Sequence, residues 1–171
     1  MKLPIEMILL VTLFVIVYAT PRYLLPQVLN TDVPLAVVES GSMEPTIHAG
    51  DLLVVVGYNP ADIVEKDIIV FRASFLNGSL TVHMVISKGE EEGKIYYWTK
   101  GEANVFPDPR IYKGRYSVVE TEVHGVVACR IPLVGYLSLL VLRYFGIKFG
   151  LLLLPLLILS FKKSLTRRGH F

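Results

Sequence analysis

The stretch Ser40-Gly41-Ser42-Met43-Glu44-Pro45-Thr46 places two serines around a glycine and then adds a proline. Glycine lets the backbone come close to a ligand, and Pro45 prevents the segment from continuing as a regular helix or a central strand. The stretch therefore predicts an irregular turn that presents a hydroxyl group, with Ser42 as the candidate nucleophile. An ordinary Ser/Gly turn before a strand is the structural alternative.

Short apolar runs separated by turn residues surround this turn and predict an all-β domain over residues 30–130. Asn77-Gly78 indicates one tight hairpin, and the acidic loop 89–93 indicates a second. The expected strands cover residues 33–38, 52–56, 68–71, 80–86, 94–99 and 117–129.

The N-terminal end of the chain is almost wholly apolar over residues 5–19. Because about 20 apolar residues are needed to cross the hydrocarbon of a bilayer, we expect an N-terminal transmembrane anchor over residues 1–25. The end of this stretch, Val17-Tyr18-Ala19, also resembles a secretory cleavage site, so removal of the segment after Ala19 is the alternative. Both interpretations send residue 30 onward across the membrane.

Residues 131–161 form a second apolar region, in which Arg143 and Lys148 would be costly at the bilayer centre. We therefore expect an interfacial or re-entrant segment before Arg143 and a second transmembrane helix over residues 144–161. A buried amphipathic helix is the alternative. The basic tail 162–171 follows, and the positive-inside rule places it in the cytoplasm, so both termini are expected there.

Composition narrows the range of ligands. The formal net charge of +2 gives no indication of a nucleic-acid partner, and Cys129, the single cysteine, cannot form an intrachain disulfide. The sequence contains neither a Cys/His cluster with metal-ligand spacing nor a phosphate-binding loop. We therefore expect no metal ion and no other cofactor.

A serine hydroxyl needs a positioned base before it can act as a nucleophile near neutral pH. His83 lies in the middle of an apolar strand, on the face that Thr81 and Val85 share, and a half-buried imidazole there could take the proton of Ser42. A core histidine with a satisfied hydrogen bond is the structural alternative. The other histidines fit less well, because they lie in a turn, at a solvent-facing position or beyond the second span: His48, His124 and His170.

The turn around Ser42 resembles the nucleophile box of the type I signal peptidases, peptidase family S26. The run Thr81-Val82-His83-Met84-Val85-Ile86 resembles the endoplasmic-reticulum and archaeal type, which has histidine where the bacterial enzymes have lysine. Met84 departs from the arginine that is usual in the eukaryotic pattern. The resemblance covers roughly residues 33–129 and implies the β fold that signal peptidases share with self-cleaving repressors.

The run Lys100-Gly101-Glu102-Ala103-Asn104-Val105-Phe106-Pro107-Asp108 resembles the third box of that family. The resemblance implies that Asp108 orients His83, and Tyr112 matches a tyrosine beyond it. Glu102-Ala103 replaces the usual Asp-Asn, which leaves the role of Glu102 open. Taken alone, Asp108 would be a turn cap between two prolines.

The negative charge that develops on a scissile carbonyl oxygen must be met by hydrogen-bond donors. The amide of Ser42 is one candidate for this oxyanion hole, and the resemblance implies that the Ser40 hydroxyl is the other. Gly50-Asp51 also matches a family box, and its expected role is to start a strand.

The resemblance implies a membrane-bound serine endopeptidase that removes signal peptides from secreted preproteins and cuts after small residues. It places the catalytic domain on the extracytoplasmic or lumenal side of the plasma membrane or the endoplasmic reticulum. Expected partners are the preproteins and the lipid bilayer, with the protein-translocation channel as a further candidate. Two alternatives stay open: a self-cleaving protease of the repressor type, and an inactive, membrane-tethered β domain that binds signal peptides or assists a partner peptidase.

Overall fold

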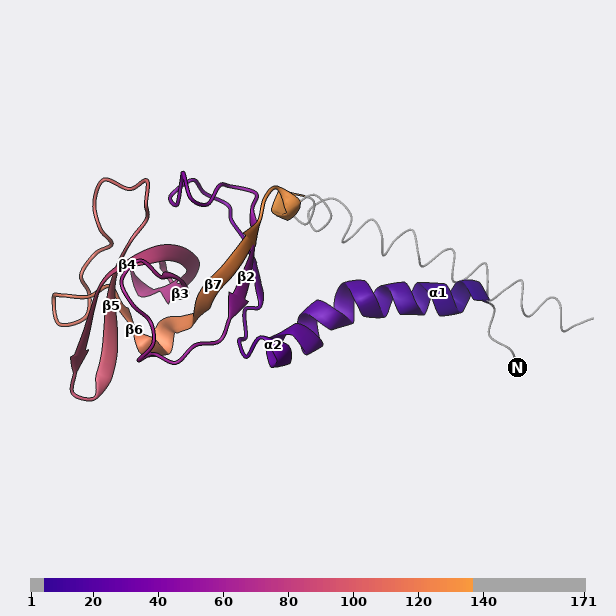
Figure 1. Cartoon of the computed structure of the whole chain (residues 1–171), viewed down its shortest axis with the longest axis horizontal. Coiled ribbons are helices and arrows are strands. Elements are labelled where there is room, and N and C mark those ends of the chain that lie inside the picture. The colour runs from indigo at the N-terminus through magenta and orange to yellow at the C-terminus, as the bar shows by residue number, and fades with distance from the viewer. Residues whose placement is uncertain (1–4, 137–171) are drawn as a thin grey trace, which may run out of the picture.

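A single antiparallel sheet of seven strands forms the body of the molecule, in the order β1-β2-β7-β3-β4-β5-β6 (Figure 1). The computed structural model describes residues 5–136. The strands are β1 (Leu35–Val37), β2 (Leu52–Val56), β3 (Ile68–Ala73), β4 (Ser79–Glu91), β5 (Lys94–Lys100), β6 (Val118–Val119) and β7 (Val123–Ile131). The predicted all-β domain is confirmed.

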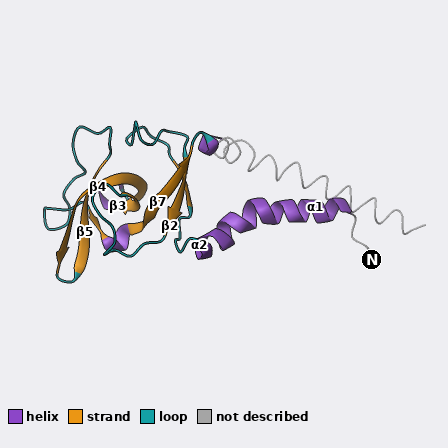
Figure 2. Ribbon diagram, in the orientation of Figure 1, coloured by secondary structure: helices purple, strands orange, loops and turns teal. Residues whose placement is uncertain are grey.

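A helical segment precedes the sheet and extends away from it (Figure 2). It consists of α1 (Ile5–Phe14), a π-helical stretch (Val15–Leu24) and α2 (Leu25–Val28). Among the described residues, no helix combines the length and the apolar character needed to cross a membrane. The N-terminal span therefore stays a prediction. The second predicted span and the basic tail lie outside the described residues.

Both expected hairpins are present. The first is less tight than predicted, because a 3₁₀ turn (Ser74–Leu76) follows β3 before the chain reverses through Asn77 and Gly78 into β4. Asn77 and Gly78 have positive φ angles of 54° and 74°, the left-handed region that asparagine and glycine tolerate best. The second turn is tighter than the predicted loop, because β4 continues to Glu91 and the chain reverses at Glu92 and Gly93.

The prediction of one continuous strand over residues 117–129 is wrong. A short 3₁₀ turn (Glu120–Glu122) separates β6 from β7, and the Glu122 carboxylate accepts a hydrogen bond from the Val119 N–H at 3.3 Å. The break has a topological reason: β6 pairs with β5 near one edge of the sheet, whereas β7 pairs with β2 and β3. One straight strand could not reach both places.

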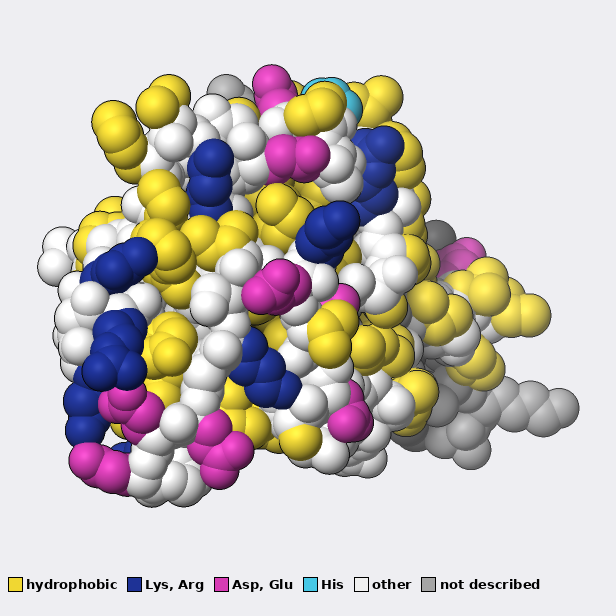
Figure 3. All heavy atoms as spheres, turned by 60° about the vertical axis from the view of Figure 1, so that its left-hand side comes forward, with side chains coloured by type: hydrophobic (Ala, Val, Ile, Leu, Met, Phe, Trp, Pro, Cys, Tyr) yellow, Lys and Arg dark blue, Asp and Glu magenta, His cyan; other side chains and the backbone are white. Residues whose placement is uncertain are grey.

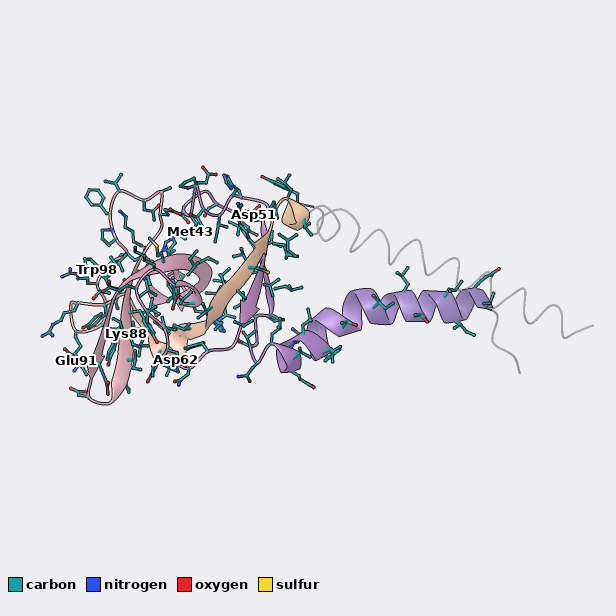
Figure 4. All side chains as sticks on the ribbon, in the orientation of Figure 1. Met43, Asp51, Asp62, Lys88, Glu91 and Trp98 are labelled. Carbon is teal, nitrogen blue, oxygen red and sulfur yellow. The ribbon has the colours of Figure 1, made fainter. Side chains whose placement is uncertain are left out.

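The sheet buries side chains on both of its faces. Successive side chains of a strand point to opposite faces, and in β3 Ile69 and Phe71 join one apolar cluster while Val70 joins the other. Met43 and Ile47, from the chain between β1 and β2, belong to the second cluster (Met43 is labelled in Figure 4). The loop that carries the predicted nucleophile is therefore anchored by buried side chains.

Candidate active site

Ser42 lies in a loop that connects β1 to β2, and the base of this loop is closed by backbone hydrogen bonding. The Val38 N–H donates to the Asp51 carbonyl at 3.0 Å. Inside the loop, the Glu44 N–H donates to the Gly41 carbonyl at 3.1 Å, which closes a turn in the stretch where the sequence predicted one. Ser42 is left half-buried, where a ligand can reach its hydroxyl.

The structure brings Ser42, His83 and Asp108 together. His83 Nδ1 lies 2.6 Å from Asp108 Oδ2, and His83 Nε2 lies 3.3 Å from Ser42 Oγ. The hydrogen-bond network assigns the proton of the neutral imidazole to Nδ1, which donates to the carboxylate and leaves Nε2 to accept from the serine hydroxyl. His83 and Asp108 are both buried, so bulk water competes little for their hydrogen bond.

The carboxylate of Asp108 is directed at His83 by contacts with β5. Thr99 Oγ1 donates to Asp108 Oδ2 at 2.6 Å, and the Asp108 N–H donates to the Thr99 carbonyl at 2.9 Å. The indole N–H of Trp98 donates to the Asp108 carbonyl at 3.0 Å (Trp98 is labelled in Figure 4). Asp108 is thus fixed as a partner of the histidine, and its carboxylate does not cap the turn between the two prolines.

Sequence reasoning missed Thr99. The pairing of β4 with β5 would have identified it. In that pairing Thr99 lies opposite Val85, which is two residues from His83 and on the same face of β4. That register is interrupted by a bulge after Val85, and the sequence alone did not indicate the bulge.

The segment 101–104 supports the backbone of Ser42. The Ala103 N–H donates to the Ser42 carbonyl at 2.9 Å. A Cβ atom on Gly101 would lie 2.7 Å from that carbonyl oxygen, so a larger residue would push the two loops apart. The Glu102 carboxylate accepts a hydrogen bond from the Thr46 N–H at 3.3 Å, which shows that Glu102 contacts the serine loop.

The two candidate oxyanion donors also lie in this loop. The hydroxyl oxygens of Ser40 and Ser42 are 3.3 Å apart, and Ser40 is exposed. When Ser42 donates to His83, the single O–H of Ser40 is the donor toward Ser42 Oγ, and the hydroxyl must rotate away from Ser42 to donate to an incoming oxygen.

Two of the remaining histidines contact other groups. His48 Nδ1 lies 3.4 Å from the guanidinium of Arg130, and His124 Nδ1 lies 2.7 Å from a carboxylate oxygen of Asp32. His170 lies outside the described residues.

Asp51 does more than start a strand. Its buried carboxylate accepts hydrogen bonds from the His48 N–H at 3.0 Å, from Arg130 Nη1 at 2.9 Å and from the Leu133 N–H at 3.2 Å. Burial alone would raise the pKa of Asp51, but the hydrogen bonds from His48, Arg130 and Leu133 lower it below its ordinary value of 3.8. Asp51 joins the base of the serine loop to the chain that follows β7 (Figure 4).

We expect Asp51→Asn to lower the free energy of unfolding at pH 7 by about 2–3 kcal/mol, because an amide cannot accept all three hydrogen bonds. The folded-state pKa is below the unfolded one, so this stabilisation is present above pH 3.8 and is lost as the pH falls through the folded value. Urea unfolding in detergent at pH 7 and pH 3 should therefore show the two proteins converging in acid. Asp62→Asn, at an exposed position, is the matched control. Equal stabilities at pH 7 would contradict this role of Asp51.

No protein-family model matches the chain. Curated proteins do match it. The signal peptidase complex catalytic subunit SEC11 of Yarrowia lipolytica is 38% identical over 130 residues, which cover 73% of each protein. SEC11C of Homo sapiens is 34% identical over 125 residues, covering 72% of this chain and 65% of the human protein, and SEC11 of Scheffersomyces stipitis is 32% identical, covering 72% and 74%. The predicted resemblance is confirmed, and the chain belongs to the family of signal peptidase catalytic subunits that includes these SEC11 proteins.

Proposed function

We propose that the chain is a serine endopeptidase that removes signal peptides from preproteins, with Ser42 as nucleophile, His83 as general base and Asp108 as the residue that orients His83. The hydrogen-bonded series from Ser42 Oγ through both ring nitrogens of His83 to Asp108 supports this proposal. The relatives are named as catalytic subunits, which favours an enzyme over an inactive binding domain.

In this mechanism, Ser42 Oγ attacks the scissile carbonyl carbon while His83 Nε2 takes the hydroxyl proton. The Ser42 amide and the Ser40 hydroxyl donate to the carbonyl oxygen as it gains negative charge. Asp108 stabilises the imidazolium that forms. When the tetrahedral intermediate collapses, the imidazolium gives its proton to the leaving amine, and the same imidazole then activates the water that releases the acyl group from Ser42.

We further propose that the protein is an integral membrane protein, anchored over residues 1–25 and again within residues 131–161. The domain over residues 30–130 would lie on the extracytoplasmic side and the tail 162–171 in the cytoplasm. Exposed apolar side chains on the N-terminal helical segment support the first anchor: Ile5, Ile8, Leu9, Leu13 and Ile16. Release of the protein from membranes by alkaline carbonate would contradict this placement.

The proposed activity is tested with the purified, detergent-solubilised chain and a preprotein that carries an Ala-X-Ala cleavage site. We expect one cut directly after the second alanine, identified by the masses of both products. A folded chain that binds the preprotein without cutting it would instead favour the inactive binding domain.

A further inference from the structure

The chain between β5 and β6 carries an apolar tip, defined here as residues 104–107. Val105 and Phe106 within it are 82% and 79% exposed, the two highest values among the large hydrophobic residues in the described part of the chain. Figure 1 shows this chain and the β1–β2 loop rising on the same side of the β domain. In Figure 3, hydrophobic side chains project along the upper rim of that end of the molecule.

Contacts at both ends of the tip place it beside the reacting groups. Ala103, immediately before the tip, donates to the Ser42 carbonyl at 2.9 Å, and Asp108, immediately after it, lies 2.6 Å from His83. One residue of extended chain spans at most about 3.6 Å, and Val105 and Phe106 are each two residues from one of these anchored positions. The backbone of Val105 therefore lies within about 7 Å of Ala103, which contacts the nucleophile Ser42, and that of Phe106 within about 7 Å of Asp108, which contacts the base His83.

The base of the tip is held in place. The Asn104 N–H donates to the Gly101 carbonyl at 3.0 Å, and the Trp98 indole N–H donates to the Asp108 carbonyl at 3.0 Å. The guanidinium of Arg110 lies 3.8 Å from the centre of the Trp98 ring, a cation–π contact that fixes the chain beyond Asp108. The two apolar side chains are thus presented to solvent from a secured base, and burial against a ligand would be favourable.

We propose that Val105 and Phe106 form an apolar contact surface for the preprotein chain next to its scissile bond. The inference rests on the proposed function, because a carbonyl within about 3.5 Å of Ser42 Oγ fixes where the substrate lies. An extended substrate advances about 3.3 Å per residue, so residues within two or three positions of the bond pass within reach of the tip. The tip would then select preproteins with apolar side chains at those positions.

The alternative is that the apolar tip contacts the surface of a lipid bilayer. The arrangement of elements favours the preprotein, because α1 leaves the β domain on the side of β2, whereas the tip follows β5 toward the other edge of the sheet (Figure 1). A membrane that holds the N-terminal segment would lie far from the tip in this arrangement.

The test measures binding of a fluorescent preprotein peptide, with five residues on each side of an Ala-X-Ala site, to the full chain carrying Ser42→Ala. We expect Val105→Ser and Phe106→Ser each to raise the peptide Kd about tenfold, because partial burial of one such apolar side chain contributes a binding free energy equivalent to about a tenfold change in Kd. Phe106→Leu keeps an apolar side chain and should stay within about threefold. Val64→Ser is the matched control, because Val64 is 58% exposed and lies in the β2–β3 loop.

Kd values within twofold of each other for Val105→Ser, Phe106→Ser and Val64→Ser would overturn the proposal. Loss of binding to vesicles of phosphatidylcholine and phosphatidylglycerol, with peptide Kd unchanged, would assign the tip to the bilayer instead. In the catalytically intact chain, the tip variants should raise KM and leave kcat within about threefold. Failure of the proposed function would appear separately, as a wild-type chain that binds the peptide but does not cleave it.

Discussion

Ser42→Ala is expected to lower kcat for preprotein cleavage by about 10⁵-fold, because the attacking oxygen is removed while the rest of the site stays in place. The loss should not reflect unfolding, since the Ser42 side chain is half-buried and its backbone carbonyl keeps the hydrogen bond from Ala103. Single-turnover assays in detergent, with product masses as the readout, would measure it.

Ser40→Ala is the matched control, because its hydroxyl lies 3.3 Å from that of Ser42 in the same loop. We expect a loss of about 10²–10³-fold, the usual effect of removing one oxyanion donor. A Ser42→Ala chain that retains activity within tenfold of wild type would exclude Ser42 as the nucleophile. Equal losses in the two variants would suggest damage to the whole loop.

Asp108→Asn is expected to lower kcat at pH 7 by about 10⁴-fold with little change in KM. The amide of asparagine can donate to His83 Nδ1, and this would place the imidazole proton on Nε2, where it could not accept the proton of Ser42. Steady-state kinetics on the same preprotein would measure the effect, and unchanged thermal unfolding would separate it from loss of structure.

Thr99→Val provides a graded comparison for Asp108→Asn. Valine has nearly the same shape as threonine but cannot donate to Asp108 Oδ2, so the carboxylate keeps His83 and loses one of its two side-chain partners. We expect a fall in kcat of about tenfold, with the order wild type, Thr99→Val, Asp108→Asn. An Asp108→Asn variant that matches wild type would show that Ser42 and His83 act as a dyad.

Much of the sheet could be predicted because strand formation depends on a local pattern. Short apolar runs and the turn residues between them gave the places of β2 to β5, and the observed bounds agree to within two residues except at the end of β4, which extends to Glu91. The last strand could not be predicted correctly, since its break at Glu120–Glu122 arises from pairing with strands that are distant in sequence.

The sequence by itself determined the three residues that the structure brings together and the family to which the chain belongs, because each residue lies in a short local motif. Only the tertiary structure decided that Ser42 and His83, 41 residues apart, and His83 and Asp108, 25 residues apart, meet within hydrogen-bond distance. It also decided the role of Glu102, which the sequence had left open: its carboxylate contacts the Thr46 backbone, while Asp108 faces the imidazole as predicted. The reason is strand register, since a bulge after Val85 and the packing of the loop after β5 set these directions.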